Sequence, residues 1–182
     1  MASDCADARH VQVASLQLPL RSPSLIRVQK PESRGMMKAL VIYDSVYGNT
    51  EKIATAIGKG LTGDTKVMRV SQVDPAGFGS IDMLIVGSPT LGGRPTEAIQ
   101  SFLSRVPDAS VRGIKVASFD TRYSGRFVKV FGFAADKIAE NLKSKGGDLR
   151  LSPEPFYVTG KKGPLKEGEL ERAATWGKSL VL

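Results

Sequence analysis

Residues 38–62 read KALVIYDSVYGNTEKIATAIGKGLT, and this stretch decides the fold. A short apolar run at 39–43 leads into a polar turn at 44–50 that contains one glycine. After the turn, apolar residues recur at the spacing of one helical face: Ile53, Ala54, Ile57 and Leu61. This pattern predicts a buried strand that passes through a loop directly into an amphipathic helix.

The loop between this strand and helix is rich in hydroxyl and amide groups, from Ser45, Asn49 and Thr50, and contains Gly48. The first backbone N–H groups of a helix have no intrahelical partner and carry the positive end of the helix dipole. The stretch therefore predicts a site for a phosphate group. The alternative is an ordinary strand–turn–helix that Asn49 or Thr50 caps.

The same alternation of strand and helix continues through the rest of the chain. Further strands are predicted at 65–70, 81–87, 114–119 and 148–158, the last interrupted by prolines. Further helices are predicted at 96–106, 128–144 and 165–182, with a single helical turn at 73–76. Strands joined by helices run parallel, with helices on both faces of the sheet. We therefore expect an α/β, doubly wound, five-stranded parallel sheet of order 2-1-3-4-5, and its ligand at the carboxyl edge.

The pattern Ser-x-x-Gly-Asn-Thr at 45–50 resembles the phosphate loop of flavodoxins, which bind FMN. It lacks the glycines of a Walker loop or of a G-x-G-x-x-G fingerprint. The resemblance covers residues 37–182 and is to the short-chain form of the family. It implies a flavodoxin-like FMN-binding domain in which neutral hydroxyl and amide donors hold the phosphate.

Two further loops, at 88–95 and 120–126, are expected to grip the flavin ring. The resemblance implies this set of FMN-binding residues: Ser45, Val46, Tyr47, Gly48, Asn49, Thr50, Ser88, Pro89, Thr90, Leu91, Gly92, Gly93, Asp120, Thr121, Arg122, Tyr123 and Gly125. Gly92 and Gly93 suit the ring because glycine accepts both signs of φ, although such a pair also marks a plain turn. Tyr123 either stacks on the ring or packs under its own loop. Leu91 stands where many flavodoxins have a second aromatic.

The chain is basic, with a formal net charge of +8. Arg94, Arg122 and Arg126 fall in or beside the two ring loops, and two interpretations of them stay open. They either stabilise the reduced, anionic flavin or face an acidic redox partner. A nucleic-acid partner is not expected, because no recognisable binding motif accompanies the charge. A phosphoacceptor signalling domain would need an aspartate where the third strand ends in Gly87 and Ser88.

The cysteine and histidine content limits the chemistry. Cys5 and His10, the single residues of each kind, both precede the predicted domain, so neither a Cys or His nucleophile nor a metal site is expected there. A cofactor has to carry any redox chemistry. We expect an electron carrier between redox partners, and the alternative is an FMN-dependent NAD(P)H:quinone-type oxidoreductase. The lack of a second domain for nicotinamide favours the carrier, and the oligomeric state stays open.

Residues 1–36 differ from the rest of the chain and predict a disordered tail, with three prolines and no sustained hydrophobic period. Met36 and Met37 directly precede the first strand. The alternative to a tail is therefore that the start was assigned too far upstream. Asp4 and Asp7 stand where a signal peptide carries positive charge. No run of about 18 apolar residues occurs, so we expect a cytoplasmic protein without membrane insertion.

Overall fold

A parallel β-sheet forms the centre of the computed structural model, which describes residues 36–77, 79–123 and 132–182. Its strands within these ranges are β1 (Lys38–Tyr43), β2 (Asp64–Arg69), β3 (Met83–Pro89), β4 (Lys115–Tyr123), β5 (Asp148–Leu149) and β6 (Glu154–Val158). The order is β2-β1-β3-β4-β5, and β6 also pairs with β4. The predicted order of the sheet is therefore confirmed. The predicted tail lies outside the described residues and stays a prediction.

The fifth position of the sheet is divided between two short strands, as the prolines predicted. β5 pairs with Lys115 and Val116 of β4, whereas β6 pairs with the later part of the same strand, from Phe119 to Tyr123. Proline carries no backbone N–H and is tolerated mainly at sheet edges. Pro153 lies in the gap between the two strands, and Pro155 lies within β6 at the edge.

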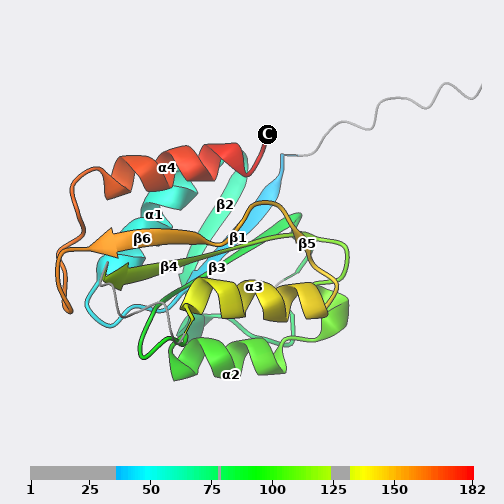
Figure 1. The fold of residues 1–182 in the computed structure, drawn as a ribbon. Coiled ribbons are helices and arrows are strands. Elements are labelled where there is room, and N and C mark those ends of the chain that lie inside the picture. Colours follow the sequence, from blue (N-terminus) through cyan, green and yellow to red (C-terminus); the bar gives the residue numbers. More distant parts are fainter. Residues whose placement is uncertain (1–35, 78, 124–131) are drawn as a thin grey trace, which may run out of the picture. The chain divides into compact units, whose positions relative to one another are not determined.

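Two layers of helices cover the two faces of the sheet (Figure 1). The helices are α1 (Asn49–Gly60), α2 (Glu97–Arg105), α3 (Ala134–Ser144) and α4 (Glu169–Ser179), with short 3₁₀ helices at Val70–Gln72 and Asp108–Ser110. Alternate residues of β1 enter different cores, since side chains of a strand alternate between its faces. Val41 packs with α1 and α4, and Ile42 packs with α2 and α3. None of the helices in the described ranges is long and apolar enough to cross a bilayer.

Several predicted boundaries are wrong, and tertiary contacts explain the differences. The strand β4 continues through Tyr123, where a loop was predicted, because β6 pairs with residues 119–123. The strand β3 likewise continues to Pro89, in register with Thr121. The single turn predicted at 73–76 lies instead at Val70–Gln72, as a 3₁₀ helix.

The last two helices begin later than predicted. α3 starts at Ala134, and Phe133, which falls inside the predicted helix, is an extended, half-buried residue before it. The predicted residues 128–131 of this helix lie outside the described ranges. α4 starts at Glu169 after Gly168, which has a φ of 78°. Leu170, in the first turn of this helix, is exposed.

The helices α1 and α4 cross closely at two glycines. A Cβ at Gly177 would lie 2.5 Å from the carbonyl oxygen of Ile57, and a Cβ at Gly60 would overlap the carbonyl oxygen of Ala174. This close approach brings the first helix, and with it the loop at 44–50, into a fixed position on the sheet.

We predict that Gly177→Ala destabilises the protein by about 2 kcal/mol, because the added methyl group forces the two helices apart. The sign is informative, since alanine normally stabilises a helix interior by about 1 kcal/mol relative to glycine. Urea unfolding followed by circular dichroism measures the change. Gly77→Ala is the control, because a Cβ at Gly77 has nothing within 4 Å. An increase in stability for Gly177→Ala would contradict the close crossing.

Candidate functional site

A cavity of about 330 Å³ lies at the carboxyl edge of the sheet, where the loop after β1, the turn after β3 and the end of β4 meet. Most of the predicted site residues line it: Ser45, Val46, Tyr47, Asn49, Thr50, Pro89, Thr90, Leu91, Gly92, Thr121, Arg122 and Tyr123. The predicted convergence of the three segments is therefore confirmed for the described residues. It places the cavity where a doubly wound sheet binds its ligand.

Four predicted residues do not line the cavity, and a fifth, Gly125, lies outside the described residues. Gly48 is the residue that precedes α1, and Gly93 belongs to a tight turn. The side chains of Ser88 and Asp120 are completely buried beneath the cavity. The Ser88 hydroxyl accepts from the backbone N–H of Thr96 at 2.9 Å and donates to the carbonyl of Pro89 at 3.0 Å.

The phosphate-type loop leaves the start of α1 without a side-chain cap. The N-cap is Gly48, with a φ of 80° and no side chain to accept from the helix. The alternative that Asn49 or Thr50 caps the helix is wrong. The Asn49 amide donates to the carbonyl of Lys162 at 3.0 Å, and the Thr50 hydroxyl pairs with the Thr121 hydroxyl at 2.8 Å. The first N–H groups of α1 are therefore available to a ligand.

Ser45 provides an independent sign that this loop fits an anion. The residue is only 5% exposed, yet its Oγ has no hydrogen-bond partner among the described residues. Buried hydroxyls are normally paired, so one without a protein partner beside a cavity is suited to bonding a ligand there. Arg69 of β2 fixes the loop from behind, since it donates to the Ser45 carbonyl and lies 3.5 Å from the Asp44 carboxylate. The residues present fit a phosphate group.

The second segment forms a tight turn between Leu91 and Arg94. The backbone N–H of Leu91 donates to the carbonyl of Arg94 at 2.9 Å, and the reverse bond is 3.1 Å. The two central residues, Gly92 and Gly93, have φ values of 56° and 78°, and positive φ at both positions is typical of a type I′ turn. The glycine pair therefore makes a turn and also presents one member, Gly92, to the cavity.

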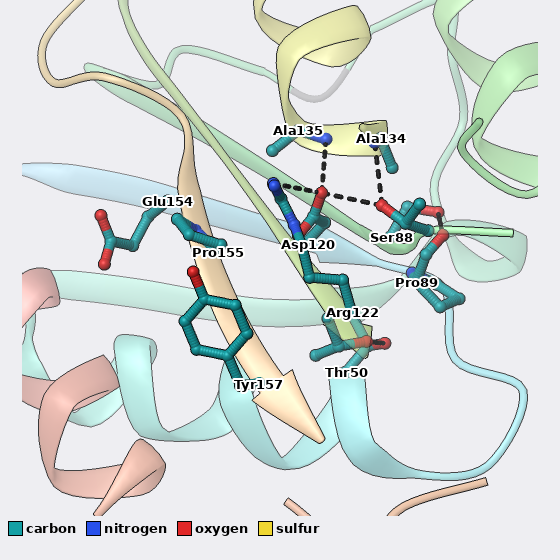
Figure 2. A network of polar contacts seen from close by, with 12 residues as sticks. Thr50, Ser88, Pro89, Asp120, Arg122, Ala134, Ala135, Glu154, Pro155 and Tyr157 are labelled. Carbon is teal, nitrogen blue, oxygen red and sulfur yellow. Dashed lines mark hydrogen bonds and ion pairs between the residues drawn. The ribbon is translucent and has the colours of Figure 1, made fainter. Parts of the chain in front are cut away.

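The third segment is held by the buried carboxylate of Asp120 (Figure 2). Arg122 donates to both of its oxygens, at 2.6 and 2.7 Å, and the hydroxyl of Thr90 donates to it at 2.8 Å. The backbone N–H of Ala135 also donates to it, at 3.1 Å. Burial raises the pKa of Asp120, and Arg122 and the other donors oppose this rise. The network joins the ends of β3 and β4 to the start of α3.

Arg122, which was expected either to stabilise the reduced flavin or to face an acidic redox partner, has its charge balanced in the structure. Its guanidinium pairs with Asp120 and lies 3.5 Å from the centre of the Phe133 ring. Arg122 thus lines the cavity as one half of a neutral pair. Arg94 is exposed, without an ion pair among the described residues, and Arg126 lies outside them.

Large apolar side chains surround the cavity without being buried. Val46 and Tyr123 are each 52% exposed, and Tyr47 and Leu91 are each 48% exposed. Exposed apolar side chains that gather in one place indicate a binding surface. Tyr123 lines the cavity. Its stacking on a flat ligand stays a prediction.

Sequence reasoning missed a fourth segment, the loop after β6. Val158 at the end of β6 and Lys161 from the loop after it line the cavity. The sequence placed ligand loops only after the first, third and fourth strands, where the order of the sheet brings them together. The signal that could have found the fourth segment is the pairing of the proline-rich fifth strand with the end of β4.

This combination of a doubly wound sheet, an uncapped helix start and an apolar-rimmed cavity defines a nucleotide-type cofactor-binding protein. The sequence model of the family described as "Flavodoxin" matches residues 41–176, which is most of the chain. The chain belongs to the flavodoxin family, whose members are electron-transfer flavoproteins that bind FMN. FMN is accordingly its cofactor.

Individual relatives agree with this family. A flavodoxin from Synechocystis sp. is 32% identical over 111 residues, which cover 57% of this chain and 65% of that protein. A flavodoxin from Maridesulfovibrio salexigens is 29% identical over 80% of this chain and 98% of that protein. The crystal structure of oxidised flavodoxin 2 from Bacillus cereus has a TM-score of 0.67 at 21% identity, over 79% of this chain and 97% of that chain.

Not every relative is matched along its whole length. The chain spans less than two thirds of the Synechocystis flavodoxin, and about a quarter of the length of two larger curated relatives. The activity and partners of the whole protein are therefore treated below as proposals.

We predict that Arg122→Met lowers the free energy of unfolding by about 3 kcal/mol near neutral pH, because it leaves the buried Asp120 carboxylate without its cation. Arg122 lowers the pKa of Asp120, so its removal raises this already raised pKa further. A group whose pKa is raised by folding contributes stability below its ordinary pKa and loses that stability as the pH rises. The deficit in the free energy of unfolding should thus be largest near neutral pH. It should shrink as the pH falls toward 3.8, the ordinary pKa of an aspartate.

Urea unfolding of the wild type and Arg122→Met across this pH range measures the deficit. The control compares Asp120→Asn with the double variant Asp120→Asn, Arg122→Met, neither of which has a carboxylate to titrate at this position. The cost of removing Arg122 in this background should vary little with pH in this window. A deficit of Arg122→Met that is equally independent of pH would show that the ion pair does not carry the stability.

Proposed function

We propose that this chain is a flavodoxin that holds FMN in the cavity at the carboxyl edge and passes electrons between redox partner proteins. The observation that carries the proposal is the unpaired, buried Oγ of Ser45 beside the uncapped start of α1. Both features lie in the loop that the family uses for phosphate. When bound, FMN supplies the electron-transfer chemistry, which the side chains alone lack.

Each part of the cavity has a proposed role. The Ser45 and Thr50 hydroxyls and the backbone amides from 46 to 50 hold the phosphate. The turn at Leu91–Arg94 and the ring of Tyr123 enclose the flavin ring, with Tyr47 at the same rim. The buried groups of Ser88 and Asp120 act indirectly, because their hydrogen bonds position Thr90, Thr96 and the start of α3.

The surface around the cavity supports transfer to a protein partner. The four apolar side chains at the rim are about half exposed, which suits transient contact with another protein. Arg94 is an exposed cation in the turn at that rim, so we propose that the partner is acidic there. A cytoplasmic location is part of the same proposal.

The alternative, an NAD(P)H:quinone-type oxidoreductase, is not favoured. The match to the flavodoxin family covers residues 41–176, and flavodoxins are electron carriers. The FMN-loaded protein should therefore accept electrons from a chemical reductant and return them to a one-electron acceptor. It should not turn over NAD(P)H with a quinone in a steady-state assay. Sustained turnover would favour the enzyme, and a colourless protein that refuses micromolar FMN would refute both.

We predict that Ser45→Ala weakens FMN binding about tenfold, because a hydrogen bond to a charged phosphate oxygen is lost. Its stability without FMN should change little, since the hydroxyl has no hydrogen-bond partner among the described residues. Quenching of FMN fluorescence on titration with apoprotein measures the affinity. Ser118→Ala is a matched control, because the Ser118 hydroxyl is also buried and unpaired but does not line the cavity. Equal FMN affinity of the two variants would contradict the proposed phosphate site.

A further inference from the structure

The loop between β6 and α4 lies against the loop proposed to hold the phosphate. In Figure 1 this orange loop lies beside the cyan turn that leads into α1. The Asn49 amide donates to the carbonyl of Lys162 at 3.0 Å, a contact between residues 113 positions apart in the sequence. The β6–α4 loop therefore forms a fourth wall at the phosphate end of the cavity.

Gly163 shows how closely the two loops approach. It has a φ of 103°, and a Cβ there would lie 2.5 Å from the Asn49 side-chain nitrogen. A larger residue at this position would displace the Asn49 side chain or the loop. The Asn49 side chain thus holds the two segments together by its hydrogen bond and by its close packing against Gly163.

The loop is also closed on itself, which limits where Lys161 can lie. The backbone N–H of Thr159 donates to the carbonyl of Pro164 at 2.8 Å, and that of Gly163 donates to the carbonyl of Gly160 at 3.1 Å. Lys161 is one of the two central residues of the turn from 160 to 163. Its backbone is held at both sides, and its side chain lines the cavity together with Ser45 and Thr50.

The charge of Lys161 is not neutralised by the described residues. Its side chain is exposed and has no ion pair among them. The nearby cations differ in this respect, because Arg69 lies against Asp44 and Arg122 pairs with Asp120. Among the described residues that line the cavity, Lys161 is therefore the cation without a carboxylate partner.

We propose that Lys161 supplies the positive charge that holds the FMN phosphate, and so sets the preference for FMN over riboflavin. The inference rests on the proposed function, since it concerns the same cofactor in the same cavity. It replaces the expectation of neutral donors alone by a mixed site. Ser45 and the start of α1 give direction through hydrogen bonds, and Lys161 gives a point charge from a remote loop.

The test compares Lys161→Gln with Lys162→Gln by titration of apoprotein with FMN and, separately, with riboflavin. Lys162 is the matched control, because it is exposed in the same turn, carries the same charge and does not line the cavity. Its contact with Asn49 uses the backbone carbonyl, which the substitution keeps. Each titration is made at low and high ionic strength, about 0.02 M and about 0.5 M salt.

We expect Lys161→Gln to weaken FMN binding about fivefold at low salt, to lose most of the salt dependence and to leave riboflavin affinity unchanged. Lys162→Gln should bind FMN nearly as the wild type does. FMN affinity of Lys161→Gln equal to that of Lys162→Gln would overturn this inference and leave the proposed function intact. A parallel loss of riboflavin affinity would also overturn it, because the role would then not concern the phosphate. A wild type that binds no FMN would overturn the proposed function itself.

Discussion

The buried carboxylate of Asp120 is the interaction on which the geometry of the site depends. It accepts from the hydroxyl at the end of β3, from the guanidinium two residues along β4 and from the backbone at the start of α3. These elements come from three separate parts of the chain. A buried carboxylate is tolerated only when its oxygens are fully paired, so each element has to keep its place. The hydroxyl of Thr90 extends the constraint, since it also accepts from the N–H of Ala134 at 2.9 Å.

The same network explains why α3 begins where it does. The sequence 128–144 has helical periodicity throughout, and sequence reasoning therefore started the helix at 128. In the structure, the first N–H groups of α3 are satisfied by Thr90 and Asp120, which act as remote caps at Ala134 and Ala135. Such caps come from residues more than ten positions away, so no local pattern reveals them. The Phe133 ring before the helix instead lies against the Arg122 guanidinium.

The order of the sheet could be predicted because it follows from local patterns. Alternating apolar strands and amphipathic helices allow few topologies, and the turn at 45–50 identified the family. Most residues of the site followed from that order, since Ser45, Leu91 and Tyr123 each stand near a strand end. What could not be predicted depends on pairing between distant side chains. Arg122 was expected to act through its charge on the flavin or on a partner, and only its pairing with the buried Asp120 shows that this charge is balanced.

The distribution of charge in the cavity follows from these pairings and bears on electron transfer. Near the expected ring, the cation of Arg122 is balanced by Asp120, and the rim beyond it is apolar at Leu91 and Tyr123. At the opposite end, Lys161 and the start of α1 concentrate positive character around the expected phosphate. A doubly charged group is thereby attracted to one end of the cavity, while an uncharged ring suits the other. The cofactor would enter in one orientation, with its ring toward the apolar surface where a partner protein can approach.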